Sequence, residues 1–151
     1  MARSSLLKGL RVLIVDDDRD TREMLKMVLE GCEAYAHTAA SGPEALQMLK
    51  RVNPNVLISD IGMPQMDGNQ LIRKIRSLTP DQGGQIPAAA LTAYAGVEDR
   101  MRSLLAGYQI HLAKPVDPAE LIAVVASLAR RTQEFEQANG FQREGHKIPA
   151  G

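Results

Sequence analysis

Several features that are common in proteins are scarce in this chain of 151 residues. Aromatic residues make up 3% of the sequence and tryptophan is absent, so the core has to be built from aliphatic side chains. The single cysteine, Cys32, excludes an internal disulfide and fits the reducing cytoplasm, where we expect the protein to lie. The 18 basic and 18 acidic side chains cancel, which predicts no general attraction to nucleic acid or acidic membranes. No apolar run approaches the ~20 residues that span a bilayer.

Five short segments rich in apolar residues are the expected β-strands. They span residues 11–15, 34–39, 56–59, 88–93 and 110–113. The first, third and fourth are nearly continuous apolar runs, which is typical of strands covered on both faces of a parallel sheet.

Five helical patterns alternate with these strands and have recognisable ends. Ser41 with Glu44 matches a capping box, Gly31 and Gly107 suit helix ends, and Asp117 precedes the last helix. We expect the apolar stripe of each helix to pack against the sheet. These stripes contain Met24, Leu25, Val28 and Leu29; Leu71, Ile72 and Ile75; Val97, Met101, Leu104 and Leu105; and Leu121, Val124, Val125 and Leu128. Alternating strands and helices predict a doubly wound α/β domain.

The alternating pattern covers most of the chain but not its ends. We expect residues 1–9 to form a lead-in, residues 10–130 to form the domain, and residues 131–151 to form a flexible polar tail after a frayed helix end. The roughly 20 polar residues of the tail are too few for a DNA-binding helix-turn-helix, so we expect no binding to nucleic acid.

Polar side chains stand at the ends of four of the predicted strands or directly after them. These are Asp16, Asp17 and Asp18 after the first strand, Asp60 after the third, Thr92 in the fourth, and Lys114 after the fifth. Ligands of open α/β sheets bind beyond the carboxyl ends of the strands, so we expect these groups to share one crevice. Clustered carboxylates repel each other, and a hard divalent cation such as Mg²⁺ relieves that repulsion.

Four segments, in this order, carry a resemblance to a known family: VLIVDDD, VLISDIGMPQMDG, AALTAYA and HLAKPV. Over residues 10–130 the chain resembles the receiver domain of two-component response regulators. The resemblance implies a flavodoxin-like (βα)5 fold with a five-stranded parallel sheet in the order 2-1-3-4-5. It also implies a phosphoacceptor in a signalling phosphorelay rather than an enzyme, with at most self-phosphotransfer and weak autodephosphorylation.

The resemblance assigns the metal site and the phosphoacceptor. Asp60 matches the carboxylate that accepts a phosphoryl group from the phosphohistidine of a sensor kinase or a histidine phosphotransfer protein. Asp17 matches a direct ligand of Mg²⁺, with Mn²⁺ as an alternative, and Asp16 matches a group that binds the ion through water. Gly62 matches the residue whose backbone carbonyl completes the site.

The resemblance also assigns the groups around the phosphoryl oxygens. Thr92 matches the hydroxyl that hydrogen-bonds the phosphoryl group, and Lys114 matches the lysine that pairs with one of its oxygens. The bond between Lys114 and Pro115 is expected to be cis. Asp18 and Asp67 have no such role, and we interpret them as residues that cap helices or hold turns.

Two positions depart from the usual pattern or modulate it. His111 stands where receivers usually carry the aromatic switch residue, so a histidine replaces the side chain that usually couples phosphorylation to output. Tyr94 lies two residues after Thr92, and our hypothesis is that it restricts the attacking water and slows autodephosphorylation. The expected partner surface comprises the fourth helix, fifth strand and fifth helix, with Met101, His111 and Glu120 as members.

Two alternatives concern the class and setting of the chain. A haloacid dehalogenase-type phosphatase would also begin with a strand followed by Asp-x-Asp, but it needs Thr or Val where Asp20 stands and a late acidic pair. The receiver reading leaves open whether the chain acts alone or belongs to a hybrid sensor kinase.

Overall fold

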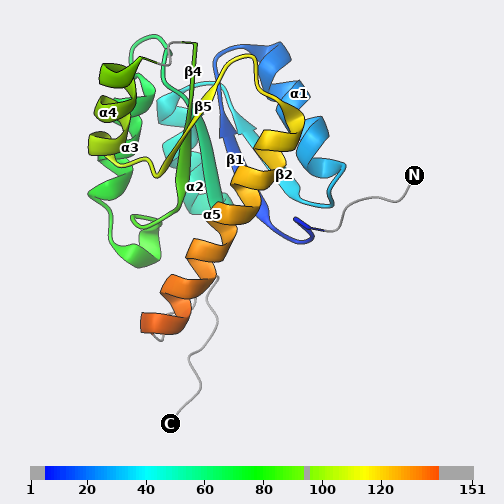
Figure 1. The fold of residues 1–151 in the computed structure, drawn as a ribbon. Coiled ribbons are helices and arrows are strands. Elements are labelled where there is room, and N and C mark those ends of the chain that lie inside the picture. The colour runs from blue at the N-terminus through cyan, green and yellow to red at the C-terminus, as the bar shows by residue number, and fades with distance from the viewer. Residues whose placement is uncertain (1–5, 94–95, 140–151) are drawn as a thin grey trace.

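A computed structural model describes residues 6–93 and 96–139, with side chains described up to residue 131. Strands and helices alternate from the first strand to the last helix (Figure 1). The strands are β1 (Arg11–Val15), β2 (Tyr35–Ala39), β3 (Val56–Asp60), β4 (Ala88–Thr92) and β5 (Ile110–Ala113). The helices are α1 (Arg19–Glu30), α2 (Gly42–Val52), α3 (Gly68–Arg76), α4 (Val97–Ala106) and α5 (Pro118–Asn139), with a short 3₁₀ helix at Pro80–Gln82 that the sequence analysis did not anticipate.

The five strands form one parallel sheet in the order β2-β1-β3-β4-β5. This confirms the predicted fold class and strand order, and the strand limits agree with the predicted segments to within one residue at each end. β3 and β4 lie inside the sheet and are buried along their whole length, which explains their nearly continuous apolar sequences.

Two apolar layers cover the two faces of the sheet. On one face, Leu25 and Leu29 of α1 join Leu121, Val125 and Leu128 of α5. On the other face, α2, α3 and α4 enclose a second core that includes Leu71, Ile72 and Ile75. Figure 1 shows α1 and α5 together on one side, with α2, α3 and α4 across the sheet. Within the described part of the chain, no helix has the length and apolar character that a membrane span requires.

Both ends of the domain are more structured than the sequence analysis anticipated. Leu7, which we assigned to the lead-in, is completely buried in the core beside α1 and α5. The backbone of α5 continues to Asn139, eight residues past position 131, where we placed the start of the tail. The domain limits themselves remain a prediction.

The expectation that α4 packs its apolar stripe against the sheet is wrong. Val97, Met101, Leu104 and Leu105 are 63%, 55%, 50% and 85% exposed, whereas Ser103 and Ala106 are buried. An amphipathic pattern shows which residues share a face, but not whether that face meets the protein or the solvent. Here the small side chains of α4 face inward. Met24 of α1 is also exposed, although the rest of its stripe packs as expected.

The helix beginnings near the carboxyl edge of the sheet are held by short polar side chains. Asp18 caps α1 and accepts hydrogen bonds from the backbone nitrogen and the hydroxyl of Thr21, at 3.0 and 2.6 Å. Asp67 caps α3 in a reciprocal capping box with Gln70. Both were expected to hold caps or turns, and the structure confirms this.

Candidate functional site

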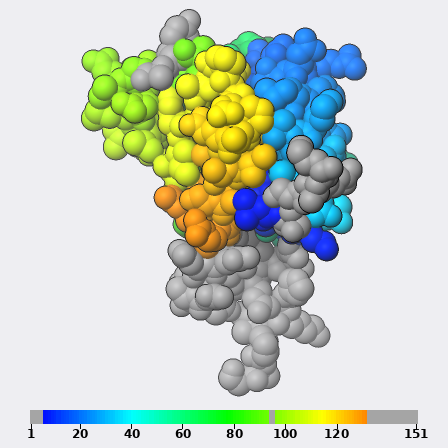
Figure 2. Space-filling model, turned by 45° about the vertical axis from the view of Figure 1, so that its right-hand side comes forward, coloured from blue at the N-terminus to red at the C-terminus, as the bar shows by residue number. Residues whose placement is uncertain are grey.

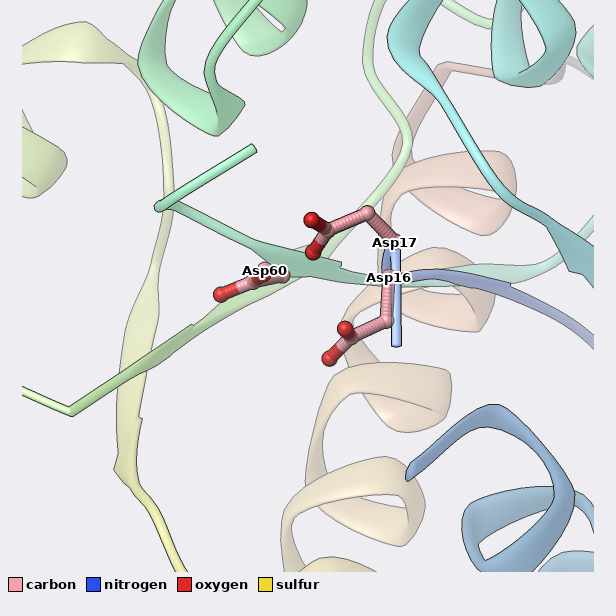
Figure 3. A group of neighbouring side chains, drawn as sticks. All are labelled: Asp16, Asp17 and Asp60. Atoms are coloured by element: carbon pink, nitrogen blue, oxygen red, sulfur yellow. The ribbon is translucent and has the colours of Figure 1, made fainter. Parts of the chain in front are cut away.

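Three carboxylates meet at the carboxyl edge of the sheet. Asp60 is the last residue of β3, and Asp16 and Asp17 directly follow β1, the neighbouring strand. One carboxylate oxygen from each lies within 4.8 Å of the other two. Figure 3 shows all three carboxylates pointing to the same side of the sheet edge. Asp16 and Asp60 are buried, with 0% and 6% of their surface exposed, whereas Asp17 is exposed.

Lys114 supplies the positive charge closest to this cluster. Its Nζ lies 3.0 Å from Oδ2 of Asp16 and 3.2 Å from Oδ1 of Asp60. The backbone nitrogen of Lys114 donates to the carbonyl of Thr92 at 2.8 Å, which ties the end of β5 to the end of β4. The peptide bond between Lys114 and Pro115 is cis, as expected.

The pKa values of the site residues reflect burial and mutual charge. Burial, together with the neighbouring charge of Asp16, raises the pKa of Asp60 although Lys114 opposes the change. Burial alone would lower the pKa of Lys114, but the carboxylates of Asp16 and Asp60 outweigh it and raise that pKa. Lys114 therefore stays protonated at neutral pH. Its single positive charge offsets only part of the negative charge of the carboxylates.

The donor set fits a hard divalent cation. Three carboxylates face one lysine, which leaves an excess of negative charge in a partly buried crevice. Oδ2 of Asp16 is buried and accepts no hydrogen bond from the described residues, although it lies within ion-pair distance of Lys114. Carboxylates and water are the ligands that Mg²⁺ prefers, so these residues could hold such an ion.

The remaining predicted site residues lie beside the cluster. Thr92 ends β4, is buried, and lies one residue beyond Leu91, the register partner of Asp60. The backbone nitrogen of Gly62 donates to Oδ1 of Asp60 at 3.3 Å. A cavity of about 240 Å³ is lined by Gly62, Thr92 and residues of α3 and α4, so the site opens towards these helices.

Of the two positions expected to modulate the signal, His111 and Tyr94, the structure describes only His111. His111 is half-buried in β5, next to Ala90 of β4, and its buried Nε2 makes no hydrogen bond within the described residues. Burial lowers the pKa of His111, and Arg100 of α4 adds to this effect while Asp99 opposes it. The structure therefore favours a neutral imidazole at neutral pH. Tyr94 lies outside the described residues.

The sequence analysis missed residues that hold the site in place. Nη1 of Arg22 in α1 donates to the carbonyl of Asp16 at 2.8 Å, and Asp16 itself accepts from the backbone of Asp18 at 2.9 Å. Tyr108, buried before β5, donates its hydroxyl proton to the carbonyl of Gly68 at 2.6 Å. The rarity of aromatic residues was the signal that could have drawn attention to Tyr108.

Known proteins match this fold and this sequence. The family model for the response regulator receiver domain matches residues 12–126. A 14.6 kDa protein encoded beside sodA1 in Leptolyngbya boryana, described as uncharacterized, is 47% identical over 79% of this chain and 89% of its own length. Response regulator MprA of Mycobacterium leprae is 38% identical over 85% of this chain. This chain spans only about half (55%) of the MprA length.

Solved structures agree with the sequence matches. The receiver domain of the Francisella response regulator 1452 superimposes with a TM-score of 0.75 at 31% identity, over 82% of this chain and 99% of that chain. The chemotaxis protein CheY4 of Vibrio cholerae gives a TM-score of 0.74 at 29% identity, over 80% and 98%. The order of the strands, the acidic cluster at their carboxyl edge and these matches lead to one conclusion: the chain belongs to the response regulator receiver family, whose members are phosphoacceptors in two-component signalling.

Proposed function

We propose that Asp60 is the phosphoacceptor of this domain. The observation that carries the proposal is its position, because among the described residues Asp60 is the one carboxylate that ends a central strand, contacts Lys114 and also lies within the acidic cluster. An Asp60 oxygen attacks the phosphorus of a phosphohistidine, and a new O–P bond forms as the P–N bond breaks. The leaving imidazole keeps the electron pair of the P–N bond and takes up a proton.

Asp17, Asp60 and the carbonyl of Gly62 would hold Mg²⁺ directly in this proposal, with Asp16 bound through water and Mn²⁺ as an alternative ion. Both oxygens of Asp16 already face a protein group, Oδ1 the backbone nitrogen of Asp18 and Oδ2 the ammonium of Lys114, which supports binding of the ion through water. When bound, the ion supplies charge neutralisation to the phosphoryl oxygens. Asp16 also orients Lys114, since its Oδ2 lies 3.0 Å from Nζ.

Lys114 and Thr92 would stabilise the transferred phosphoryl group. Lys114 already lies 3.2 Å from the Asp60 carboxylate, so a small movement brings its ammonium to a phosphoryl oxygen. Thr92 offers a hydroxyl from the neighbouring strand end. Phosphoryl transfer depends mainly on positioning and charge stabilisation, which these groups supply without acid–base chemistry.

His111 and Tyr94 would modulate the signal. His111 lies in β5 near α4, so a movement of Thr92 on phosphorylation could be transmitted to this ring. Tyr94 would restrict water and slow autodephosphorylation. Tyr94→Ala is expected to shorten the lifetime of the phosphoryl group, and an unchanged lifetime would contradict this role.

The decisive experiment is Mg²⁺-dependent labelling by acetyl phosphate, read by intact-protein mass spectrometry. We expect one phosphoryl group per chain, lost in Asp60→Asn and retained in Asp20→Asn, which changes an exposed carboxylate in the first turn of α1. Continued labelling of Asp60→Asn would refute the proposal. Sustained turnover of the phosphodonor without a stable label would favour a phosphatase.

The proposed partners are a histidine kinase or a phosphotransfer protein upstream and another protein downstream, with a cytoplasmic location. The downstream surface would include the exposed side chains of α4, namely Val97, Met101, Leu104 and Leu105, which form an apolar patch beside β5. Figure 2 shows α4, in yellow-green, on the outside of the molecule beside the yellow segment that leads into α5. Phosphorylation would bias a two-state equilibrium on this surface.

A further inference from the structure

Tyr108 makes a buried connection between two parts of the chain that are 40 residues apart. It lies between α4 and β5 and is only 3% exposed. Its hydroxyl donates to the backbone carbonyl of Gly68 at 2.6 Å, a short distance for a neutral hydrogen bond. Burial raises the pKa of Tyr108 above its ordinary value, so the hydroxyl keeps its proton throughout the neutral range.

Gly68 is where the loop that follows Asp60 returns to the sheet. Its backbone nitrogen donates to the carbonyl of Ile61 at 2.9 Å and so closes the loop of residues 61–67. A Cβ atom at Gly68 would collide with the carbonyl oxygen of Asp60 and would lie 2.8 Å from Cα of Ile61. The residue that Tyr108 holds is therefore in contact with the backbone of Asp60.

The other end of α3 is attached to the same place. Arg76, the last residue of α3, donates to the carbonyl of Gly107 from Nε at 3.0 Å and from Nη2 at 2.7 Å. Gly107 has a φ of 135°, and a Cβ there would lie 2.9 Å from Cγ of Arg76. Both ends of α3 are thus bound to the adjacent residues Gly107 and Tyr108, which directly follow α4.

We propose that Tyr108 is a positioning residue for the phosphoacceptor loop, which it couples to the end of α4 through its hydrogen bond to Gly68. The loop includes Gly62, so its placement sets how well the site binds Mg²⁺ and a phosphoryl mimic. This inference rests on the proposed function of Asp60.

The test compares Tyr108→Phe, which removes only the hydroxyl, with Tyr35→Phe, which removes the hydroxyl of an exposed tyrosine on β2. Binding of Mg²⁺, and then of beryllofluoride in the presence of Mg²⁺, is measured by calorimetry, and the fold is checked by circular dichroism. Loss of one buried hydrogen bond is expected to weaken binding by about 3- to 10-fold in Tyr108→Phe, while Tyr35→Phe matches the unchanged protein.

Equal affinities in folded Tyr108→Phe and in the unchanged protein would overturn the proposal and leave Tyr108 a purely structural residue. Hydrogen exchange on the unchanged protein gives a test that needs no variant. Beryllofluoride should slow exchange at the amides of Gly68 and Tyr108 together, and protection confined to the loop would refute the coupling. If the unchanged protein binds no beryllofluoride and takes up no label, the proposed function fails instead.

Discussion

α3 and α4 cover the same face of the sheet and each follows a strand that ends in a site residue, yet they present opposite surfaces. The apolar residues of α3, Leu71, Ile72 and Ile75, are completely buried, whereas the large apolar residues of α4 face the solvent. α3 begins with a reciprocal capping box, but α4 is preceded by Gly96, which provides no side-chain cap. This contrast fits the two proposals above, in which α3 would hold the phosphoacceptor loop and α4 would offer a surface to a protein partner.

The strongest test of this comparison replaces one leucine in each helix. Leu71→Ala removes a buried side chain of α3 and is expected to cost about 2–5 kcal/mol of unfolding free energy. Leu105→Ala removes a side chain that is 85% exposed and is expected to change stability by less than about 0.5 kcal/mol. Urea denaturation of both variants measures the difference. Similar losses would show that α4 packs its stripe after all.

One glycine in the phosphoacceptor loop, Gly62, and one directly after it, Gly68, sharpen the α3 side of the comparison. Gly68→Ala places a methyl group against the backbone of Asp60 and Ile61, and such overpacking typically costs about 1–3 kcal/mol. At Gly62 a Cβ meets nothing within 4 Å, so Gly62→Ala should leave stability unchanged. Thermal unfolding distinguishes the two, and a stable Gly68→Ala variant would argue against a tightly held loop.

The helix caps provide a third comparison. Asp67→Ala removes the cap of α3 and should cost about 0.5–2 kcal/mol. Gly96→Ser offers α4 a cap that it lacks and should gain a few tenths of a kcal/mol at most. Chemical denaturation reports both changes. If Gly96→Ser stabilised the protein as much as Asp67→Ala destabilised it, a cap would be worth the same at both helices and this comparison would fail.

The smallest expected effect is a pH dependence from the two half-buried histidines. Burial lowers the pKa of both histidines below the ordinary value of 6.5. His111 lies next to α4, and His37 lies in β2, the strand at the other edge of the sheet. The unfolded chain therefore takes up these protons first as pH falls, so stability decreases as pH drops through about 6.5. Urea midpoints at about pH 7.5 and about pH 5.5 measure the decrease.

His111→Asn and His37→Asn should each make the midpoint less sensitive to pH in this range. A midpoint that fell equally in the double variant would assign the pH dependence to other groups.

The strand ends were the most predictable feature, because a polar residue that ends an apolar run can be recognised from local sequence. Asp60, Thr92 and Lys114 each follow such a run, and all three lie at one edge of the sheet. The orientation of α4 was not predictable in the same way. Its pattern is equally regular whether Leu104 or Ser103 faces the sheet, and only the packing of α3 and β5 beneath it decides.

Long-range contacts were beyond the reach of local patterns. Tyr108 and Gly68 are separated by the rest of α3, by β4 and by α4, and nothing adjacent to either residue indicates the other. Local sequence also does not distinguish Asp16 from Asp17, because both carboxylates point into the cluster at the sheet edge although only Asp16 is buried.

The length of α5 has a mechanical consequence. Its first three turns are anchored to the sheet through Leu121, Val125, Leu128 and Ala129, and its backbone then continues to Asn139, past the sheet in Figure 1. The ten residues after Ala129 extend about 15 Å at 1.5 Å per residue. A tilt of about 10° around Ala129 would therefore displace the far end of the helix by about 2–3 Å. Any tilt of α5 at the sheet would therefore be accompanied by a larger displacement at Asn139.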